Sequence, residues 1–278
     1  MQAGTVKQKK LMHNIWIALV LTTIAGLSTG IGSLIALIAK RTNTKFLCVS
    51  LGFSAGVMLY VSFMDIIPTA KSELVLHLGD RAGILGLLLA FFGGMALITL
   101  IDFLIPKTNN PHEFKDVEEM RKLDGRQKSL YRMGIVVALS LVAHNFPEGI
   151  AVFTSAFSGG LMVAIPITIA IALHNIPEGI AVSVPIYYAT GNRQKAFWFS
   201  FLSGLAEPLG ALAAYLFLLP FWSPLINGIV MAAVAGIMVY ISLDELLPTA
   251  EKYGEHHLSI SGLIAGMVMM ALSLFFFL

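Results

Sequence analysis

Hydrophobic residues form long uninterrupted runs along this chain, and short polar connections separate the runs. A transmembrane helix needs about 20 consecutive apolar residues, and eight stretches reach that length. They do not alternate polar and apolar positions as a membrane strand would, so all are predicted to be helices. The stretches cover residues 14–39, 46–68, 83–105, 132–157, 161–188, 196–219, 224–248 and 258–278.

The composition indicates a membrane protein. Of the 278 residues, 57% are hydrophobic and only 12% are charged, whereas a soluble globular protein has about 25% charged residues. So little charge excludes an ordinary soluble enzyme, a disordered chain and a nucleic-acid-binding protein. The single cysteine, Cys48, excludes a disulfide scaffold and a cysteine-rich zinc site. We therefore predict one all-α polytopic membrane domain over residues 1–278, with a polar loop at about 107–130.

The Lys and Arg residues predict the orientation of the helices. Thirteen of the 18 lie on the side that contains the 107–130 loop, and five lie on the other side. Because cytoplasmic loops carry the excess of positive charge, the side with 13 is predicted to be cytoplasmic. Both termini then lie on the non-cytoplasmic side, although three lysines near the N-terminus argue for the opposite orientation.

Two motifs occur twice in the chain. AGVMLYVSFMDIIPTA at Ala55–Ala70 and AGIMVYISLDELLPTA at Ala235–Ala250 share eight of sixteen positions. HNFPEGIAV at His144–Val152 and HNIPEGIAV at His174–Val182 share eight of nine. A fainter match relates Gly26–Gly32 to Gly204–Gly210. Chance similarity of apolar sequence explains matching glycines and leucines, but not two copies of each motif.

These duplications pair predicted helices 1–3 with helices 6–8, and helix 4 with helix 5. An odd number of crossings separates the members of each pair, so they run in opposite directions across the membrane. The sequence therefore predicts an inverted-topology repeat. Transporters built in this way bind their substrate near the bilayer midplane, at the interface of the repeats.

Acidic residues inside the apolar stretches are the clearest sign of chemistry. No Lys or Arg lies in the interior of a stretch, whereas Glu148, Glu178 and Glu207 lie well inside the fourth, fifth and sixth. An ionised carboxylate at that depth costs roughly 2.5–3.5 kcal/mol. Three of them without a cationic side chain must be protonated or must bind a cation. We favour a bound cation, with protonation as the alternative.

The HNxPEG motifs add further metal ligands. In each, the histidine precedes the glutamate by four residues, so both lie on one helix face, and proline frees a backbone carbonyl nearby. A lone intramembrane histidine is as easily a packing residue, but the duplicated motif favours metal binding. Imidazole, carboxylate and amide ligands suit Zn²⁺ and Fe²⁺, and also admit Mn²⁺ and Co²⁺. The predicted metal ligands are His144, Asn145, Glu148, His174, Asn175, Glu178 and Glu207.

Three more acids lie nearer the ends of the duplicated stretches. Asp65 is near the non-cytoplasmic end of the second stretch, and Asp244 and Glu245 are near the cytoplasmic end of the seventh. They either attract metal at the two mouths of a pathway or cap helix ends. Four histidines are predicted to lie in loops, exposed to solvent: His77, His112, His256 and His257.

The two HNxPEG motifs, together with the Glu207-Pro208 pair, resemble those of the ZIP (Zrt-, Irt-like) metal transporters. The resemblance covers essentially the whole chain. It implies eight helices with both ends outside and a multi-pass protein of the cell inner membrane. It also implies uptake of Zn²⁺, with Fe²⁺ and other divalent ions admitted, as cargo rather than as a cofactor. The family's two-metal site maps onto Asn145, Glu148, His174, Asn175, Glu178 and Glu207, with His144 as a further ligand.

Our first hypothesis is therefore a secondary divalent-metal transporter in a lipid bilayer, with no catalytic residue. An intramembrane metallohydrolase would use the same ligands to activate water, but the chain has no HExxH motif. A passive channel is the third hypothesis and would differ in its kinetics. The sequence leaves a homodimer and proton coupling open.

Overall fold

The computed structural model describes residues 2–38, 44–104, 138, 141–142, 145–157, 160–253 and 255–277. Within these ranges the chain is almost wholly helical and contains no strand, so the all-α prediction is confirmed. Most of the fourth predicted stretch, including His144, lies outside the described residues, as does the 107–130 loop.

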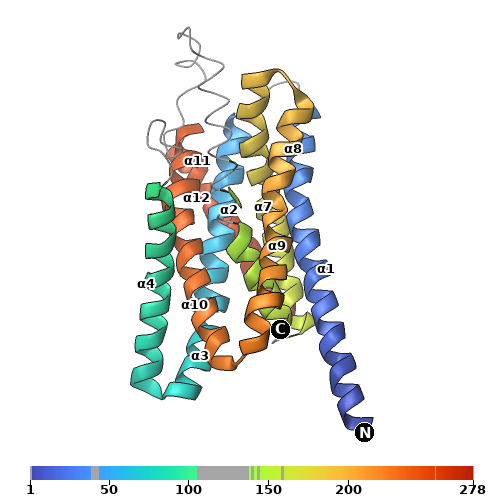
Figure 1. Ribbon diagram of the computed structural model, residues 1–278. Coiled ribbons are helices and arrows are strands. Elements are labelled where there is room, and N and C mark those ends of the chain that lie inside the picture. The colour runs from blue at the N-terminus through green and yellow to red at the C-terminus, as the bar shows by residue number, and fades with distance from the viewer. Residues whose placement is uncertain are drawn as a thin grey trace.

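Long helices run up and down side by side to form an elongated bundle (Figure 1). Several crossings are built from consecutive helical pieces, and three of these pieces, η1, η3 and η5, are π-helical turns. In chain order the elements are α1 (Gln2–Ile38), α2 (Thr44–Val61), η1 (Ser62–Ile66), α3 (Ile67–Leu78), α4 (Asp80–Leu104), a helical segment at 145–157, α7 (Leu161–Thr190), α8 (Arg193–Gly204), α9 (Ala206–Ala213), η3 (Ala214–Leu218), a 3-10 turn η4 (Leu219–Phe221), α10 (Pro224–Ile241), η5 (Ser242–Leu246), α11 (Leu247–Tyr253) and α12 (His256–Phe277).

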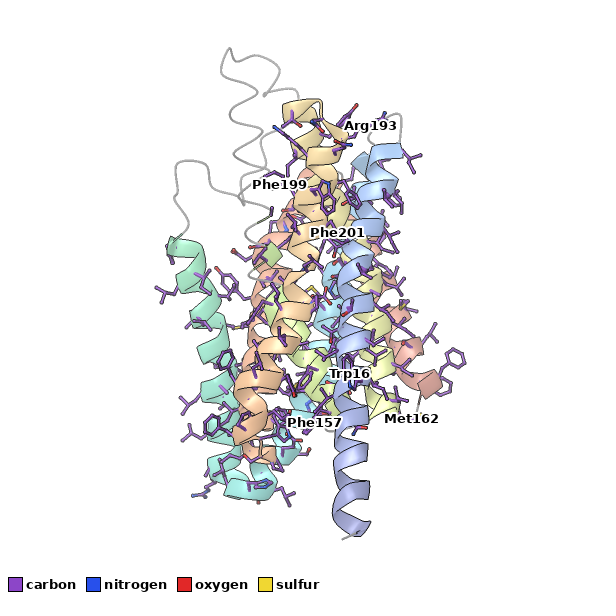
Figure 2. All side chains as sticks on the ribbon, turned by 45° about the vertical axis from the view of Figure 1, so that its right-hand side comes forward. Trp16, Phe157, Met162, Arg193, Phe199 and Phe201 are labelled. Carbon is purple, nitrogen blue, oxygen red and sulfur yellow. The ribbon has the colours of Figure 1, made fainter. Side chains whose placement is uncertain are left out.

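The outside of the bundle is apolar along its length. Six helical runs are long and apolar enough to cross a membrane, judged by length and composition over the described residues. Large side chains such as Leu89 and Phe92 on α4 and Phe275 on α12 are exposed, and the side chains drawn in Figure 2 project outward over most of the length of the bundle. In water this surface would be costly, whereas a bilayer covers it at no such cost.

Several helices are longer than the apolar pattern predicts. The run that begins with α2 continues to Leu78 rather than ending at residue 68, and α11 continues to Tyr253. His77 lies in α3, and His256 and His257 lie in α12, so the prediction that they are loop residues is wrong, although all three are exposed. Hydropathy detects only the apolar part of a helix. The α3 helix ends at Gly79, whose φ of 78° suits glycine.

Glycines divide the helices into two groups. At twelve described glycines an added Cβ would come within 2.4 Å of a backbone oxygen on another helix, so the two backbones are in direct contact. Every such contact lies within one of two sets. We call α1, segment 145–157, α7, α8 and α9 the site bundle, and the runs α2–η1–α3, α4, α10–η5–α11 and α12 the frame bundle.

The glycine contacts also occur in matched pairs that follow the sequence repeat. Gly26 of α1 meets the backbone oxygen of Gly204 of α8, and Gly204 meets that of Gly26. In the frame bundle, Gly56 meets Leu263 while its repeat mate Gly236 meets Phe91. Two inverted copies related by a two-fold axis must exchange contacts in this way. The predicted pairing of helices 1–3 with helices 6–8 is confirmed.

The boundary between the two bundles is packed with apolar side chains. A buried core cluster spans it and includes Met58 and Met238 from the frame bundle and Ile171 and Val152 from the site bundle. None of the described glycines brings backbones into such contact across this boundary. The bundles therefore meet through side chains, while each is held together by direct backbone contact.

Candidate metal site

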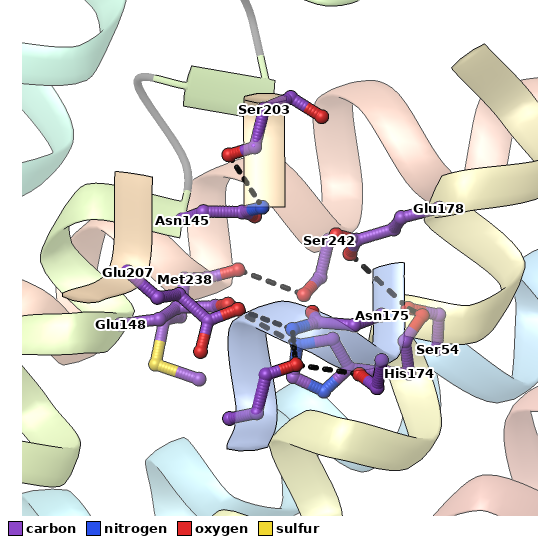
Figure 3. A network of polar contacts seen from close by, with 12 residues as sticks. Ser54, Asn145, Glu148, His174, Asn175, Glu178, Ser203, Glu207, Met238 and Ser242 are labelled. Carbon is purple, nitrogen blue, oxygen red and sulfur yellow. Dashed lines mark hydrogen bonds and ion pairs between the residues drawn. The ribbon is translucent and has the colours of Figure 1, made fainter. Parts of the chain in front are cut away.

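Three carboxylates converge inside the site bundle (Figure 3). Glu148 comes from segment 145–157, Glu178 from α7 and Glu207 from the first turn of α9, and all three have 0% exposure. The sequence predicts these carboxylates as ligands, and the structure brings them together.

Histidine and serine hold two of the carboxylates in place. His174 Nε2 lies 3.1 Å from Glu148 Oε1, which joins α7 to segment 145–157. Ser54 of α2 lies 3.5 Å, through its Oγ, from Glu178 Oε1 and donates to it. Ser54 belongs to the frame bundle, so this hydrogen bond crosses the boundary between the bundles.

The two motif asparagines make matching hydrogen bonds. Asn145 Nδ2 donates to the backbone oxygen of Ser203 at 3.2 Å, and Asn175 Nδ2 donates to that of Ala25 at 3.0 Å. Ser203 and Ala25 are themselves repeat mates, since each precedes one glycine of the Gly26 and Gly204 pair. Asn175 Nδ2 also donates to Glu207 Oε1. In each asparagine the hydrogen bond from the amide nitrogen fixes the side chain, and the amide oxygen points away from the backbone carbonyl that accepts this bond.

Several buried oxygens at this site lack a hydrogen-bond donor. Among the described residues, no donor reaches Asn145 Oδ1, Asn175 Oδ1 or Glu207 Oε2. All three atoms are acceptors, and a buried acceptor without a partner costs about 1–3 kcal/mol. Divalent cations would satisfy oxygens of this kind, since amide and carboxylate oxygens are among their ordinary ligands.

A break between α8 and α9 positions Glu207. Pro208 has no N–H, so the carbonyl of Gly204 loses its helical donor, and α8 ends there while α9 begins at Ala206. Glu207 therefore lies in the first turn of a helix, where the backbone dipole favours negative charge. By contrast, α7 passes through Pro177 as one continuous helix.

The repeat is not symmetric at this position. Gly149 packs against the backbone oxygen of Glu207, and Gly179, the equivalent glycine of the second HNxPEG motif, packs against the backbone oxygen of Thr29. Thr29 is thus the counterpart of Glu207 in the other repeat, and it supplies a hydroxyl instead of a carboxylate. Only one of the two repeats therefore supplies a carboxylate at this position, through Glu207.

The acids predicted at the mouths lie in matching π-helical turns. Asp65 is in η1 and Glu245 is in η5, they are repeat mates, and both are half-buried. Asp244 is exposed on the surface of the bundle, beside the exposed Leu243. π-Helical turns within α-helices are frequent at functional positions, but nothing else here tests a mouth role, which stays a prediction.

The described residues contain no ready-made group of three His, Cys, Asp or Glu side chains in metal-binding geometry. Of the predicted ligands, His144 lies outside the described residues. The other six are buried in the site bundle, where His174 contacts Glu148 and Asn175 contacts Glu207. Ser54 is the contributor that the sequence did not reveal. Ser54 directly precedes the duplicated motif that begins at Ala55, and a single serine in an apolar run does not by itself indicate a binding site.

Comparison with known proteins decides the family. The family described as "ZIP Zinc transporter" matches residues 12–274. The chain belongs to the ZIP zinc transporter family. It is similar to proteins named zinc transporter ZupT: one from Clostridium perfringens is 57% identical over 279 residues (96% of this chain and 98% of that protein), and one from Oceanobacillus iheyensis is 59% identical over 265 residues (95% and 98%). A third, from Streptococcus mutans, is 56% identical over 265 residues (95% and 99%).

Membership of the ZIP family makes this chain a transporter of divalent metal rather than an enzyme. The metallohydrolase hypothesis is therefore set aside. With six helical runs of membrane-spanning length and composition, it is a multi-pass membrane protein. Zinc is its cargo.

Proposed function

We propose that this chain takes up Zn²⁺ into the cytoplasm through the buried site formed by Asn145, Glu148, His174, Asn175, Glu178 and Glu207, with His144 as a further ligand. The observation that carries the proposal is the set of buried acceptor oxygens without a donor, on two asparagines and a glutamate. Carboxylate, imidazole and amide ligands without thiolate bind zinc loosely enough for release, and they also accept Fe²⁺, Mn²⁺ and Co²⁺.

The route follows the orientation given by the Lys and Arg residues. In that orientation both termini and α3 face outward. The α11 helix lies at the opposite end of the bundle from α3 (Figure 1), and it therefore faces the cytoplasm. Metal enters past Asp65 and leaves past Glu245 and Asp244. The protein lies in the inner membrane, lipid covers its exposed apolar side chains, and a homodimer is compatible with the scheme.

Access to the two sides alternates by movement of the site bundle against the frame bundle. Backbone contact at glycines makes each bundle rigid. The boundary is formed mostly by apolar side chains, and because apolar contacts have no fixed direction, sliding one bundle past the other costs little free energy. The carboxylates move together because all of them belong to the site bundle. Such rocking or sliding of one repeat unit against another is common in transporters with inverted repeats.

The central test is Glu178→Ala. We expect it to abolish zinc uptake by cells while the protein still reaches the membrane, because the carboxylate that would carry the ion is gone. Glu251→Gln is a matched control, since Glu251 is an exposed acid that pairs with His256 at 2.7 Å far from the site. Unchanged zinc uptake in Glu178→Ala would remove the proposal.

A further inference from the structure

A second polar cluster lies in the frame bundle, near the turn between α3 and α4. Asn227 Nδ2 of α10 donates to Glu73 Oε2 of α3 at 2.6 Å. Asn227 is only 2% exposed, and its Oδ1 has no hydrogen-bond partner among the described residues. A buried amide oxygen without a donor therefore lies beside a carboxylate, as in the central site.

His77 completes the set of metal-binding side chains. It lies one turn beyond Glu73, and its Nδ1 is 2.9 Å from the backbone oxygen of Glu73. Because a carbonyl can only accept, Nδ1 must carry a proton, and in the neutral ring Nε2 keeps its lone pair. Metal-binding histidines are usually held in this way, with one ring nitrogen donating to a carbonyl or a carboxylate.

The backbones around this cluster are held close together. Gly228 follows Asn227, and an added Cβ there would lie 2.9 Å from Leu74 Cγ and 3.2 Å from the backbone oxygen of Ala70. The Ser223 side chain caps the start of α10 by accepting from the N–H of Ile226 at 3.2 Å. The helices α10 and α3 therefore pack closely beside the pair, where Glu73 is half-buried and His77 is exposed.

We propose that Glu73, Asn227 and His77 form an outer divalent-metal site that loads ions for the transporter. Its outward direction rests on the proposed function. Along the run α2–η1–α3, Ser54 touches the central site, Asp65 follows eleven residues later and Glu73 eight residues after that. At 1.5 Å per residue, Glu73 is about 12 Å beyond Asp65. The two acids therefore lie one after the other along the path from the outer surface to the central site.

Glu73→Gln tests the site through transport kinetics. Glutamine still accepts the hydrogen bond from Asn227, so the contact between α3 and α10 survives while the charge is lost. In cells supplied with external Zn²⁺ we expect KM to rise about fivefold and the maximal rate to stay within twofold. Glu251→Gln, at the opposite end, should change neither. An unchanged KM in Glu73→Gln would mean that the Glu73 pair only joins the helices, and would overturn the proposal.

Direct binding gives a second test that does not depend on transport. In purified full-length protein carrying Glu178→Ala, equilibrium dialysis with ⁶⁵Zn²⁺ should detect a residual weak site that His77→Ala or Glu73→Gln removes. Residual binding that neither change affects would contradict the outer site. If Glu178→Ala itself transports at the normal rate, the proposed function fails, and the effects of Glu73→Gln and His77→Ala still decide the outer site.

Discussion

The site bundle and the frame bundle have the same kind of internal packing but different chemistry. Both are held together by glycines that allow backbones to touch, at Gly149 against Glu207 and at Gly56 against Leu263, for example. The three buried carboxylates, however, all come from the site bundle, and Ser54 reaches them from the frame bundle. In the proposed mechanism the ligands therefore move as one unit against a frame bundle whose facing surface is mostly apolar.

Joining the two bundles covalently should have the largest effect on transport. Thr154 Oγ1 of the site bundle lies 3.1 Å from Met231 Sδ of the frame bundle. With Cys48→Ala as background, Thr154→Cys together with Met231→Cys places two thiols across this contact. A short bifunctional methanethiosulfonate reagent joins such a pair through disulfides that a reductant breaks. We expect the link to stop ⁶⁵Zn²⁺ uptake and reduction to restore it, because the proposed transport cycle requires the bundles to move.

The single-cysteine variants treated with the same reagent serve as controls and should keep their uptake. Full transport by the cross-linked double variant, with the link confirmed by mass spectrometry, would show that the bundles do not move against each other.

Two glycine substitutions should separate transport from stability. Gly149→Ala places a Cβ 1.9 Å from the backbone oxygen of Glu207, and Gly56→Ala places one 2.0 Å from that of Leu263. Overpacking of this kind typically costs about 1–3 kcal/mol, so both variants should unfold at lower temperature. We expect Gly149→Ala alone to lower the transport rate per folded molecule, by more than tenfold, since it displaces Glu207. Thermal unfolding and flux in proteoliposomes measure the two effects, and equal loss of transport in both variants would contradict the distinction.

Removing the hydrogen bond that crosses the boundary should have the smallest effect. Ser54→Ala deletes the donor to Glu178 Oε1, and one such bond contributes about 0.5–1.5 kcal/mol. We expect KM for zinc to change by about two- to tenfold without loss of the protein from the membrane. A complete loss of uptake would mean that Ser54 is itself an essential ligand.

The duplicated motifs and intramembrane acids predicted much of this arrangement. The repeated PTA and HNxPEG motifs indicated which helices are mates, and the glycine contacts follow that pairing. Glu148, Glu178 and Glu207 could be identified because charge inside an apolar run is costly. These signals are local in sequence, and each has a direct physical reason.

Other features depend on contacts that one sequence does not display. The division into two bundles arises from glycines far apart in the chain, such as Gly94 against Ala233. Ser54 acts only because α2 packs beside α7. The continuation of α3 through Glu73 to His77 escaped the apolar pattern because those turns are polar, and the outer cluster was hidden with it.

The central claim is that the buried carboxylates carry zinc across the membrane. The most direct measurement is ⁶⁵Zn²⁺ accumulation in proteoliposomes that contain only this purified chain, compared with the triple variant Glu148→Gln, Glu178→Gln and Glu207→Gln. Glutamine keeps the size of the side chain and its ability to accept a hydrogen bond, but removes the charge. We predict saturable accumulation by the natural chain and none by the triple variant. Accumulation by the triple variant at the natural rate would contradict the account.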